Sequence, residues 1–357
     1  MKHRDVSSKW LSLLIFLSCL YVAPWMLGHL DWYAMDGYRE FLFFVPFQQF
    51  FLIGPVILFY IKSLLDPDTK GLKREDFLHF IPAALYLLYS LIVFVTDFLI
   101  LDEFYFYADG RDKDLSPWYQ ISGLACIITY TVFGIKLYSQ YRKEIVNQVS
   151  YAENIKFGWL KKFLIALLVI LTIRILFLIF LPNWGDFGIK WWYYFFFACV
   201  FYYIALSGYK NAIQSSILFE PGWRLISPDR TEEKLTISAH EITSWKEKIR
   251  VFIEEERAYQ NSNLTLRDVA NSLGTNTRLV SQVINQGFKM NFNDFINDFR
   301  LKTLKVKLQN GEHKQFTLLS LALDCGFNSK STFNRVFKKS TGLTPNQFIS
   351  HIESQKE

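Results

Sequence analysis

Cysteine is scarce in this sequence of 357 residues, which contains four cysteines and six histidines. Cys19, Cys126 and Cys199 lie inside apolar runs and Cys325 lies in a predicted helix, so no disulfide framework is expected. The histidines are scattered, and no two have metal-ligand spacing on one helix. The sequence also lacks a phosphate-binding glycine loop, an HExxH pair and a nucleophile elbow. We therefore expect no metal, no cofactor and no enzymatic activity.

Charge is also sparse, and it is unevenly placed. Charged residues make up 20% of the chain, against 51% hydrophobic and 18% aromatic residues, and the apolar excess lies before about residue 209. A membrane-spanning helix needs about 20 apolar residues. Six stretches are long enough: residues 10–27, 41–61, 77–100, 119–138, 159–181 and 190–209. Residues 1–209 are therefore predicted to form a six-span transmembrane helix bundle that acts as a sensor.

Basic residues are nearly absent from alternate loops of this bundle. Residues 1–9, 62–75 and 136–162 hold thirteen Lys and Arg, whereas the three segments between the other span ends hold four. Loops rich in Lys and Arg stay in the cytoplasm. The pattern predicts a multi-pass protein with both termini in the cytoplasm.

A few polar residues interrupt the predicted spans. Arg174 lies in the fifth span, where a cation is costly unless it is paired or hydrated. It either pairs with Asp97 of the third span or contacts an anionic or polar ligand that enters from outside. Gln48 and Gln49 lie among helix-breaking residues of the second span. They either line a cavity in a kinked helix or pack as ordinary polar residues of a bundle.

The composition changes after residue 209. Glu220-Pro221-Gly222 and Ser227-Pro228-Asp229 indicate a linker over residues 210–240, with a short helical start that continues the sixth span. Residues 241–357 carry seventeen Lys and Arg against twelve Asp and Glu, which accounts for nearly all of the net charge of +6. Such an excess suggests a polyanionic partner, although many solvated surfaces are as basic.

The C-terminal region contains the pattern of a helix-turn-helix unit. Thr265 and Asp268 have capping-box spacing at the start of a short apolar helix, and Gly274 supplies its C-terminal turn. The next helix has an apolar face, and its other face has polar residues at helical spacing. These residues are Arg278, Ser281, Gln282 and Asn285. A short helix, a glycine turn and a helix with an exposed polar stripe are typical of helix-turn-helix units.

The same pattern occurs a second time about 52 positions later, with Gly326 in the place of Gly274. Its second helix exposes Lys330, Ser331, Asn334, Arg335 and Lys338. Residues 292–309 between the units are predicted to form one helix about 25 Å long. A rigid spacer of this length would place the two second helices about 34 Å apart, in successive major grooves of DNA. The predicted fold is thus all-α, with a membrane bundle followed by a cytoplasmic tandem helix-turn-helix domain.

Residues 245–350 resemble the DNA-binding domain of the AraC/XylS family of bacterial transcription regulators. The run ALDCGFNSKSTFNRVFKK at residues 322–339 carries the resemblance, followed by Gly342 and by Thr344-Pro345. Small departures are Leu321-Ala322 in place of Ile-Ala, and Thr303 where alanine is frequent. The sugar-binding barrel of the best-known members is missing. The membrane bundle in its place is similar to that of membrane-embedded members.

The resemblance implies that the two polar stripes face DNA bases, where Arg can contact guanine and Gln or Asn can contact adenine. It implies phosphate contacts for Lys338, Lys339 and Lys289. The alternative for any one of these residues is a place on a solvated face. We expect a membrane-bound, sequence-specific transcription regulator of the bacterial cytoplasmic membrane. The alternative is a membrane receptor or transporter whose helical tail binds a protein.

The expected partners follow from this interpretation. They are double-stranded promoter DNA, the lipid bilayer, a small-molecule or membrane signal, a second copy of the chain in a homodimer, and RNA polymerase.

Overall fold

The computed structural model describes residues 6–65, 71–101, 103–108, 112–152, 157–180, 191–218 and 238–354. Over these ranges the chain is helical and has one isolated β-bridge. It divides into two compact units, which we call the N-terminal unit (Met1–Ser139 with Gly158–Leu225) and the C-terminal unit (Gln140–Phe157 with Ile226–Glu357). Residues 140–157 thus belong to the C-terminal unit, although they lie inside the segment predicted to form the membrane bundle.

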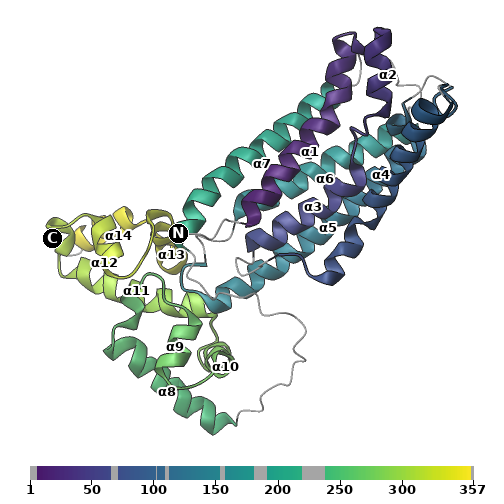
Figure 1. Cartoon of the computed structure of the whole chain (residues 1–357). Coiled ribbons are helices and arrows are strands. Elements are labelled where there is room, and N and C mark those ends of the chain that lie inside the picture. Colours follow the sequence, from purple (N-terminus) through teal and green to yellow (C-terminus); the bar gives the residue numbers. More distant parts are fainter. Residues whose placement is uncertain are drawn as a thin grey trace. The chain divides into compact units, whose positions relative to one another are not determined.

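The N-terminal unit is a bundle of long helices that run side by side (Figure 1). α1 packs against α3 and α7, and α6 packs against α7. A 3₁₀ helix, Arg74–Phe80, leads into α4, and a π-helical turn, Val95–Leu101, follows it. The helices are α1 (Val6–His29), α2 (Asp36–Phe44), α3 (Phe50–Leu65), α4 (Ile81–Phe94), α5 (Pro117–Gln148), α6 (Gly158–Phe180) and α7 (Trp191–Leu218).

Three helical segments of the described chain are long and apolar enough to cross a membrane: Val6–Gly28, Arg74–Leu101 and Pro117–Gln148. Six were predicted. The second predicted span is not continuous, because α2 ends at Phe44 and the apolar helix α3, at 16 residues, is shorter than a bilayer crossing. α6 and α7 have 23 and 28 residues. α7 continues past residue 209, as predicted, whereas the expected linker breakers at residues 220–222 and 227–229 lie outside the described residues.

The break between α2 and α3 has a physical cause. Pro46 has no backbone N–H to continue the helical ladder. Partners from the start of α5 and the loop before it take the place of that ladder. The backbone N–H of Gln48 donates to Asp114 Oδ2 at 2.9 Å, and the Gln48 carbonyl accepts from the Tyr119 hydroxyl. Polar groups in an apolar bundle require such internal partners.

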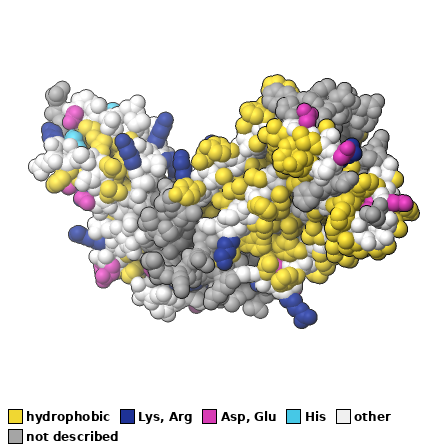
Figure 2. Space-filling view, turned by 45° about the horizontal axis from the view of Figure 1, so that its top comes forward, with side chains coloured by type: hydrophobic (Ala, Val, Ile, Leu, Met, Phe, Trp, Pro, Cys, Tyr) yellow, Lys and Arg dark blue, Asp and Glu magenta, His cyan; other side chains and the backbone are white. Residues whose placement is uncertain are grey.

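The outside of the N-terminal unit is apolar. Each of the three long apolar segments contains an apolar stretch of 18 residues. Only 17% of this stretch is buried in Arg74–Leu101, and 33% in Val6–Gly28 and in Pro117–Gln148. Hydrophobic side chains cover much of the face shown in Figure 2. Large exposed apolar side chains include Leu88, Ile100, Phe133, Phe180, Phe196 and Tyr202. Apolar surface of this extent marks contact with another apolar phase or partner.

The C-terminal unit contains two helix-turn-helix repeats, each with a hydrophobic core of its own. Val280, Val283 and Ile284 are buried in the first core, and Phe333, Val336 and Phe337 in the second, as their helical spacing predicted. The helices of this unit are α8 (Ala239–Glu255), α9 (Leu266–Ser272), α10 (Thr277–Gly287), α11 (Phe292–Gln309), α12 (Leu318–Asp324), α13 (Lys330–Thr341) and α14 (Pro345–Ser354).

Local signals in the sequence determine where these helices begin and end. The predicted capping box of α9 is present: Asp268 N–H donates to Thr265 Oγ1 at 3.2 Å, and Thr265 N–H donates to Asp268 Oδ2 at 2.8 Å. Gly274 and Gly326 end α9 and α12 with φ of 65° and 95°, which favour glycine. A Cβ atom on Gly326 would lie 2.4 Å from the Tyr259 carbonyl oxygen. The second turn therefore also needs glycine for its close approach to the first repeat.

Candidate nucleic-acid interface

The second helix of each repeat presents the polar stripe predicted from the sequence. On α10, Arg278 and Asn285 are exposed, whereas Ser281 and Gln282 are half-buried. The Asn285 amide donates to Ser281 Oγ at 3.3 Å, so these two side chains are connected along the stripe. The opposite face of α10 enters the first core. The core therefore fixes which residues of α10 point outward.

The stripe on α13 is more basic. Lys330, Ser331, Asn334, Arg335 and Lys338 are all exposed. Ser329 caps the helix, because Thr332 N–H donates to Ser329 Oγ at 3.2 Å. Only one cation, Arg278, lies on the corresponding stripe of α10. The second repeat thus provides most of the positive charge of the two stripes.

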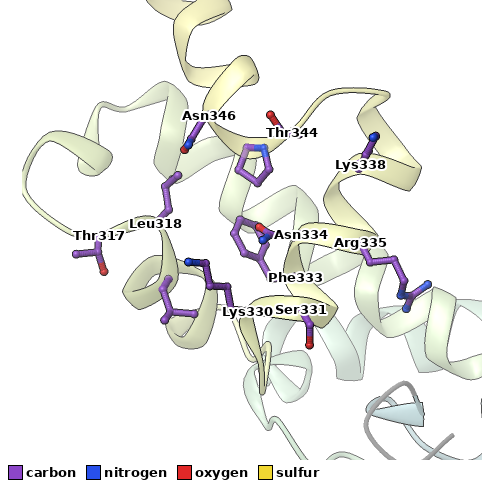
Figure 3. Close-up of a pocket in the computed structure, with 12 residues that line it drawn as sticks. Thr317, Leu318, Lys330, Ser331, Phe333, Asn334, Arg335, Lys338, Thr344 and Asn346 are labelled. Atoms are coloured by element: carbon purple, nitrogen blue, oxygen red, sulfur yellow. The ribbon is translucent and has the colours of Figure 1, made fainter. Parts of the chain in front are cut away.

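The stripe of α13 borders an open cavity of about 650 Å³ in the second repeat. Figure 3 shows Lys330, Asn334, Arg335 and Lys338 on α13, with Thr344 and Asn346 at the start of α14. Thr344 caps α14, because the Gln347 N–H donates to its Oγ1 at 3.4 Å. The start of α14 was not among the site residues predicted from the sequence. The capping pair next to the second stripe was the available signal for it.

The lysines assigned to phosphate have different surroundings. Lys338 is exposed on α13. Lys339 forms an ion pair with Asp294 of α11, with Nζ 2.9 Å from Oδ2. Lys289 is exposed in the turn after α10 and has a φ of 55°. Although the Arg335 side chain is exposed, the atoms around its guanidinium partly exclude water and lower its pKa, and the Asp294 carboxylate opposes that shift. A phosphate at Lys339 would therefore compete with Asp294.

The spacer helix α11 contacts both α10 and α13, and its bounds match the predicted ones. It also buries three polar residues that sequence analysis did not select: Asn293, Asn297 and Arg300 are 3%, 2% and 1% exposed. Their spacing of i, i+4 and i+7 places them on one face. Arg300 also lies four residues from both Ile296 and Leu304, on the apolar side of the helix, and this was the signal for its burial.

The structure does not pair Arg174 with Asp97, so that interpretation is wrong. Asp97 accepts hydrogen bonds from the backbone N–H groups of Phe106 and Tyr107, which satisfy its carboxylate within its own segment. Arg174 is 4% exposed, and its guanidinium lies 5.2 Å from the centroid of the Tyr193 ring. Its Nε has no hydrogen-bond partner in the described part of the chain.

The two glutamines of the α2–α3 break have hydrogen-bond partners within the N-terminal unit, distant in sequence for Gln48 and local for Gln49. Gln48 is fully buried, and its side-chain oxygen accepts from the Gln120 amide. Gln49 donates to the carbonyl oxygen of Pro46 at 2.6 Å. These contacts favour polar packing over a cavity lining. Over the residues the structure describes, no three His, Cys, Asp or Glu side chains come together as a metal site.

Comparison with known proteins supports the assignment of the C-terminal unit. Residues 269–351 match the helix-turn-helix domain family. The chain is 30% identical over 80 residues to the HTH-type transcriptional activator RhaR of Escherichia coli strain K12, and equally to that of Shigella flexneri serotype 5b. The match covers 22% of this chain and 27% of each relative. No solved structure matches the chain.

The chain thus spans about a quarter of the length of the curated relatives it matches. The matched residues contain most of the first repeat, the spacer and the whole second stripe. This is the region in which the run at residues 322–339 carries the resemblance noted above. Residues 269–351 thus form a helix-turn-helix domain, and their similarity to the transcriptional activator RhaR supports the resemblance to the AraC/XylS family.

Proposed function

We propose that the chain is a membrane-bound, one-component transcription regulator that binds promoter DNA through both helix-turn-helix repeats. The observation that carries this proposal is the pair of polar stripes on α10 and α13. The opposite face of each helix is buried in the hydrophobic core of its repeat, so each stripe points away from that core. Direct contact with base edges requires side chains held in this way on a helix that enters the major groove. The exposed cations of α13 supply the attraction to phosphate.

The test is genome-wide crosslinking and sequencing of DNA bound to the full-length protein in its native cell. It compares the wild type with an Arg335→Ala/Gln282→Ala double mutant. An Arg250→Ala/Gln309→Ala double mutant is the matched control, because it removes the same two residue types from α8 and the end of α11. Discrete peaks that persist in the control and vanish in the stripe mutant support the proposal. Equal enrichment in all three proteins would favour a tail that binds a protein partner.

We further propose that residues 1–209 cross the bacterial cytoplasmic membrane six times with both termini in the cytoplasm. The apolar exterior of the N-terminal unit and the three long apolar helices support a membrane location. α2 and α3 together would make the second crossing, and α6 and α7 the last two. The orientation rests on the excess of Lys and Arg in alternate loops. Cysteine accessibility in intact cells tests it: a cysteine at Ser139 should be protected from membrane-impermeant reagents, and one at Ser116 should react.

Arg174 is the residue we propose for contact with an anionic or polar signal molecule. Three observations support it: near-complete burial, neighbours among the described residues that are tyrosines rather than carboxylates, and an Nε without a hydrogen-bond partner. A buried cation without a counter-ion is costly, and ionisable groups retained inside a membrane usually have a function. Asp97, Gln48 and Gln49 have hydrogen-bond partners within the protein. A signal molecule that contacts them would have to displace these partners.

A further inference from the structure

The loop between α5 and α6 is buried in the C-terminal unit. Val149, Ser150 and Ala152 are fully buried, and Tyr151 is 4% exposed. We call residues 149–152 the docking segment. Connecting loops normally run over the surface, because buried backbone groups need partners. Four consecutive buried loop residues therefore indicate a specific binding site for this segment in the first repeat.

The backbone of the docking segment pairs with the start of α9. Val149 forms an antiparallel β-bridge with Thr265, the residue that caps α9. Ser150 N–H donates to the Leu264 carbonyl oxygen at 3.0 Å. The Asn293 amide of α11 reaches the Val149 carbonyl oxygen at 3.4 Å. The segment is thus bonded to two helices of the first repeat, and both of them contact α10.

Arg300 of α11 makes two hydrogen bonds to Ser150 of the docking segment. Its Nη1 and Nη2 donate to the backbone oxygen and Oγ of Ser150 at 3.2 and 2.9 Å. The other bonds of the guanidinium go to the carbonyl oxygens of Tyr259 and Asn261 at 2.8 Å each, and to Asn297 Oδ1 at 3.2 Å. Burial lowers the pKa of Arg300 to about 9, so the group still carries its charge at neutral pH. Without Ser150, the buried Arg300 guanidinium would lose two hydrogen bonds, and this loss would destabilise the folded C-terminal unit.

The docking segment directly follows α5. α5 is one continuous helix of 32 residues. It belongs to the N-terminal unit up to Ser139 and to the C-terminal unit from Gln140. A shift or rotation of α5 therefore acts on Val149 through the helix itself, and then on the cap of α9 and on Arg300. Rigid secondary-structure elements of this kind can carry energetic coupling between two distant sites.

We infer that the docking segment transmits the state of the bundle to the first helix-turn-helix repeat, and that DNA binding by this repeat requires the docked segment. The inference rests on the proposed function, because its readout is DNA binding. It adds the internal contact through which binding would be regulated.

The first experiment displaces the docking segment from its site without substituting any residue of the two helix-turn-helix repeats. Ser150→Lys puts an ammonium group beside the Arg300 guanidinium in a site with no room for it. Ser139→Lys makes the same change at an exposed position of α5 and is the matched control. Full-length proteins in lipid nanodiscs are compared for affinity to an operator fragment and for amide hydrogen exchange at residues 264–273. We expect about tenfold weaker operator binding and faster exchange for Ser150→Lys only.

The second experiment perturbs the bundle and follows the docking segment. A Cβ atom at Gly123 of α5 would lie 2.4 Å from Cβ of Phe50 on α3, so Gly123→Ala forces these helices apart. Gly37→Ala is the control, because no atom lies within 4 Å of its Cβ position. The exchange rate of the Ser150 amide should change in Gly123→Ala and not in Gly37→Ala. If Gly123→Ala fails to insert, Gly134→Ala replaces it, since its Cβ would clash only with the flexible end of the Ile61 side chain, at 2.5 Å, and would make an ordinary contact with Leu164 at 3.7 Å.

Reciprocity separates coupling from a purely structural role. If docking strengthens DNA binding, operator DNA must stabilise docking by the same factor. Operator DNA should thus slow exchange at the Ser150 amide of the wild type about tenfold. Unchanged operator affinity in Ser150→Lys, or a Ser150 exchange rate that ignores both DNA and Gly123→Ala, would overturn the inference while the proposed function stands. Absence of operator binding by the wild type would overturn the proposed function itself.

Discussion

Single residues on the two stripes differ in what they should contribute to DNA binding. Gln282 and Asn334 carry amides that can bond adenine in two places, whereas Lys338 is an exposed cation at the edge of the α13 stripe. Gln282→Ala or Asn334→Ala should reduce discrimination at one base pair by about 1–3 kcal/mol. Lys338→Ala should weaken binding to all sequences alike. Binding of the three variants to an operator library at fixed salt checks this, and a change of base preference in Lys338→Ala would contradict it.

Arg174 and Asp97 should behave as independent residues. Asp97 is satisfied by backbone N–H groups of its own segment, and Arg174 lies against Tyr193. Exchanging their charges in an Arg174→Asp/Asp97→Arg double mutant should therefore give no recovery. We expect the destabilisation of the double mutant to equal or exceed the sum of the single mutants, as for residues without a direct interaction. Thermal unfolding in detergent measures it, and a double mutant more stable than either single mutant would restore the ion pair.

At the scale of the elements, the two turn glycines provide a matched pair. Gly274 and Gly326 both have positive φ, but only Gly326 has atoms near its Cβ position, with the Tyr259 carbonyl oxygen at 2.4 Å. Gly274→Ala should cost about 1–2 kcal/mol, from backbone strain alone. Gly326→Ala should cost about 1–3 kcal/mol more, because the turn must move away from Tyr259. Denaturant unfolding of the full-length protein, followed by helix content, compares the two, and equal losses would contradict the prediction.

The loop before α5 should make the stability of the bundle depend on pH. Asp112 and Asp114 are 6% and 4% exposed, and burial raises the pKa of both carboxyls. Folding then favours their protonated forms, so their contribution to stability is present below about pH 4 and is lost as the pH rises through the raised pKa values, about 6 for Asp114 and about 8 for Asp112. Asp112→Asn should remove part of this loss and be more stable than the wild type at neutral pH. Exposed Asp36→Asn is the control, and unfolding temperatures from acid to neutral pH give the comparison.

Elements governed by neighbouring residues were predictable from the sequence, and those governed by distant ones were not. The Thr265–Asp268 box, the glycine turns and the bounds of α11 depend on residues a few positions apart. The break in the second span follows from Pro46, but the contacts that replace the helical ladder there depend on Asp114, which lies 66 positions from Gln48. The buried site of Ser150 depends on Arg300, at a separation of 150 residues. No local pattern contains such pairs, although the place of Arg300 on the apolar side of α11 indicated that it needed a partner.

For the whole molecule, the two interpretations of the C-terminal unit predict different responses to salt. Each phosphate that a lysine or arginine neutralises makes the slope of log affinity against log salt about 0.9 more negative. Lys289 and Lys338 are exposed, while Lys339 must first leave Asp294. Contact of all three lysines with phosphate would give a slope of about −2.7, and more if arginines of the stripes also contribute.

This slope also separates Lys338 from Lys339 in the intact protein. Lys338→Ala should make the slope about 0.9 less steep. Lys339→Ala should change the slope less than Lys338→Ala does. In the wild type, the Asp294 carboxylate already neutralises the Lys339 ammonium group. In the variant, the same carboxylate is unpaired and repels phosphate. Titrations of operator DNA into full-length protein in nanodiscs at several salt concentrations measure both slopes. A tail that recognises a protein through apolar contacts would bind operator DNA in none of these proteins, and its affinity for that partner would depend little on salt because surface charge pairs contribute little to such binding.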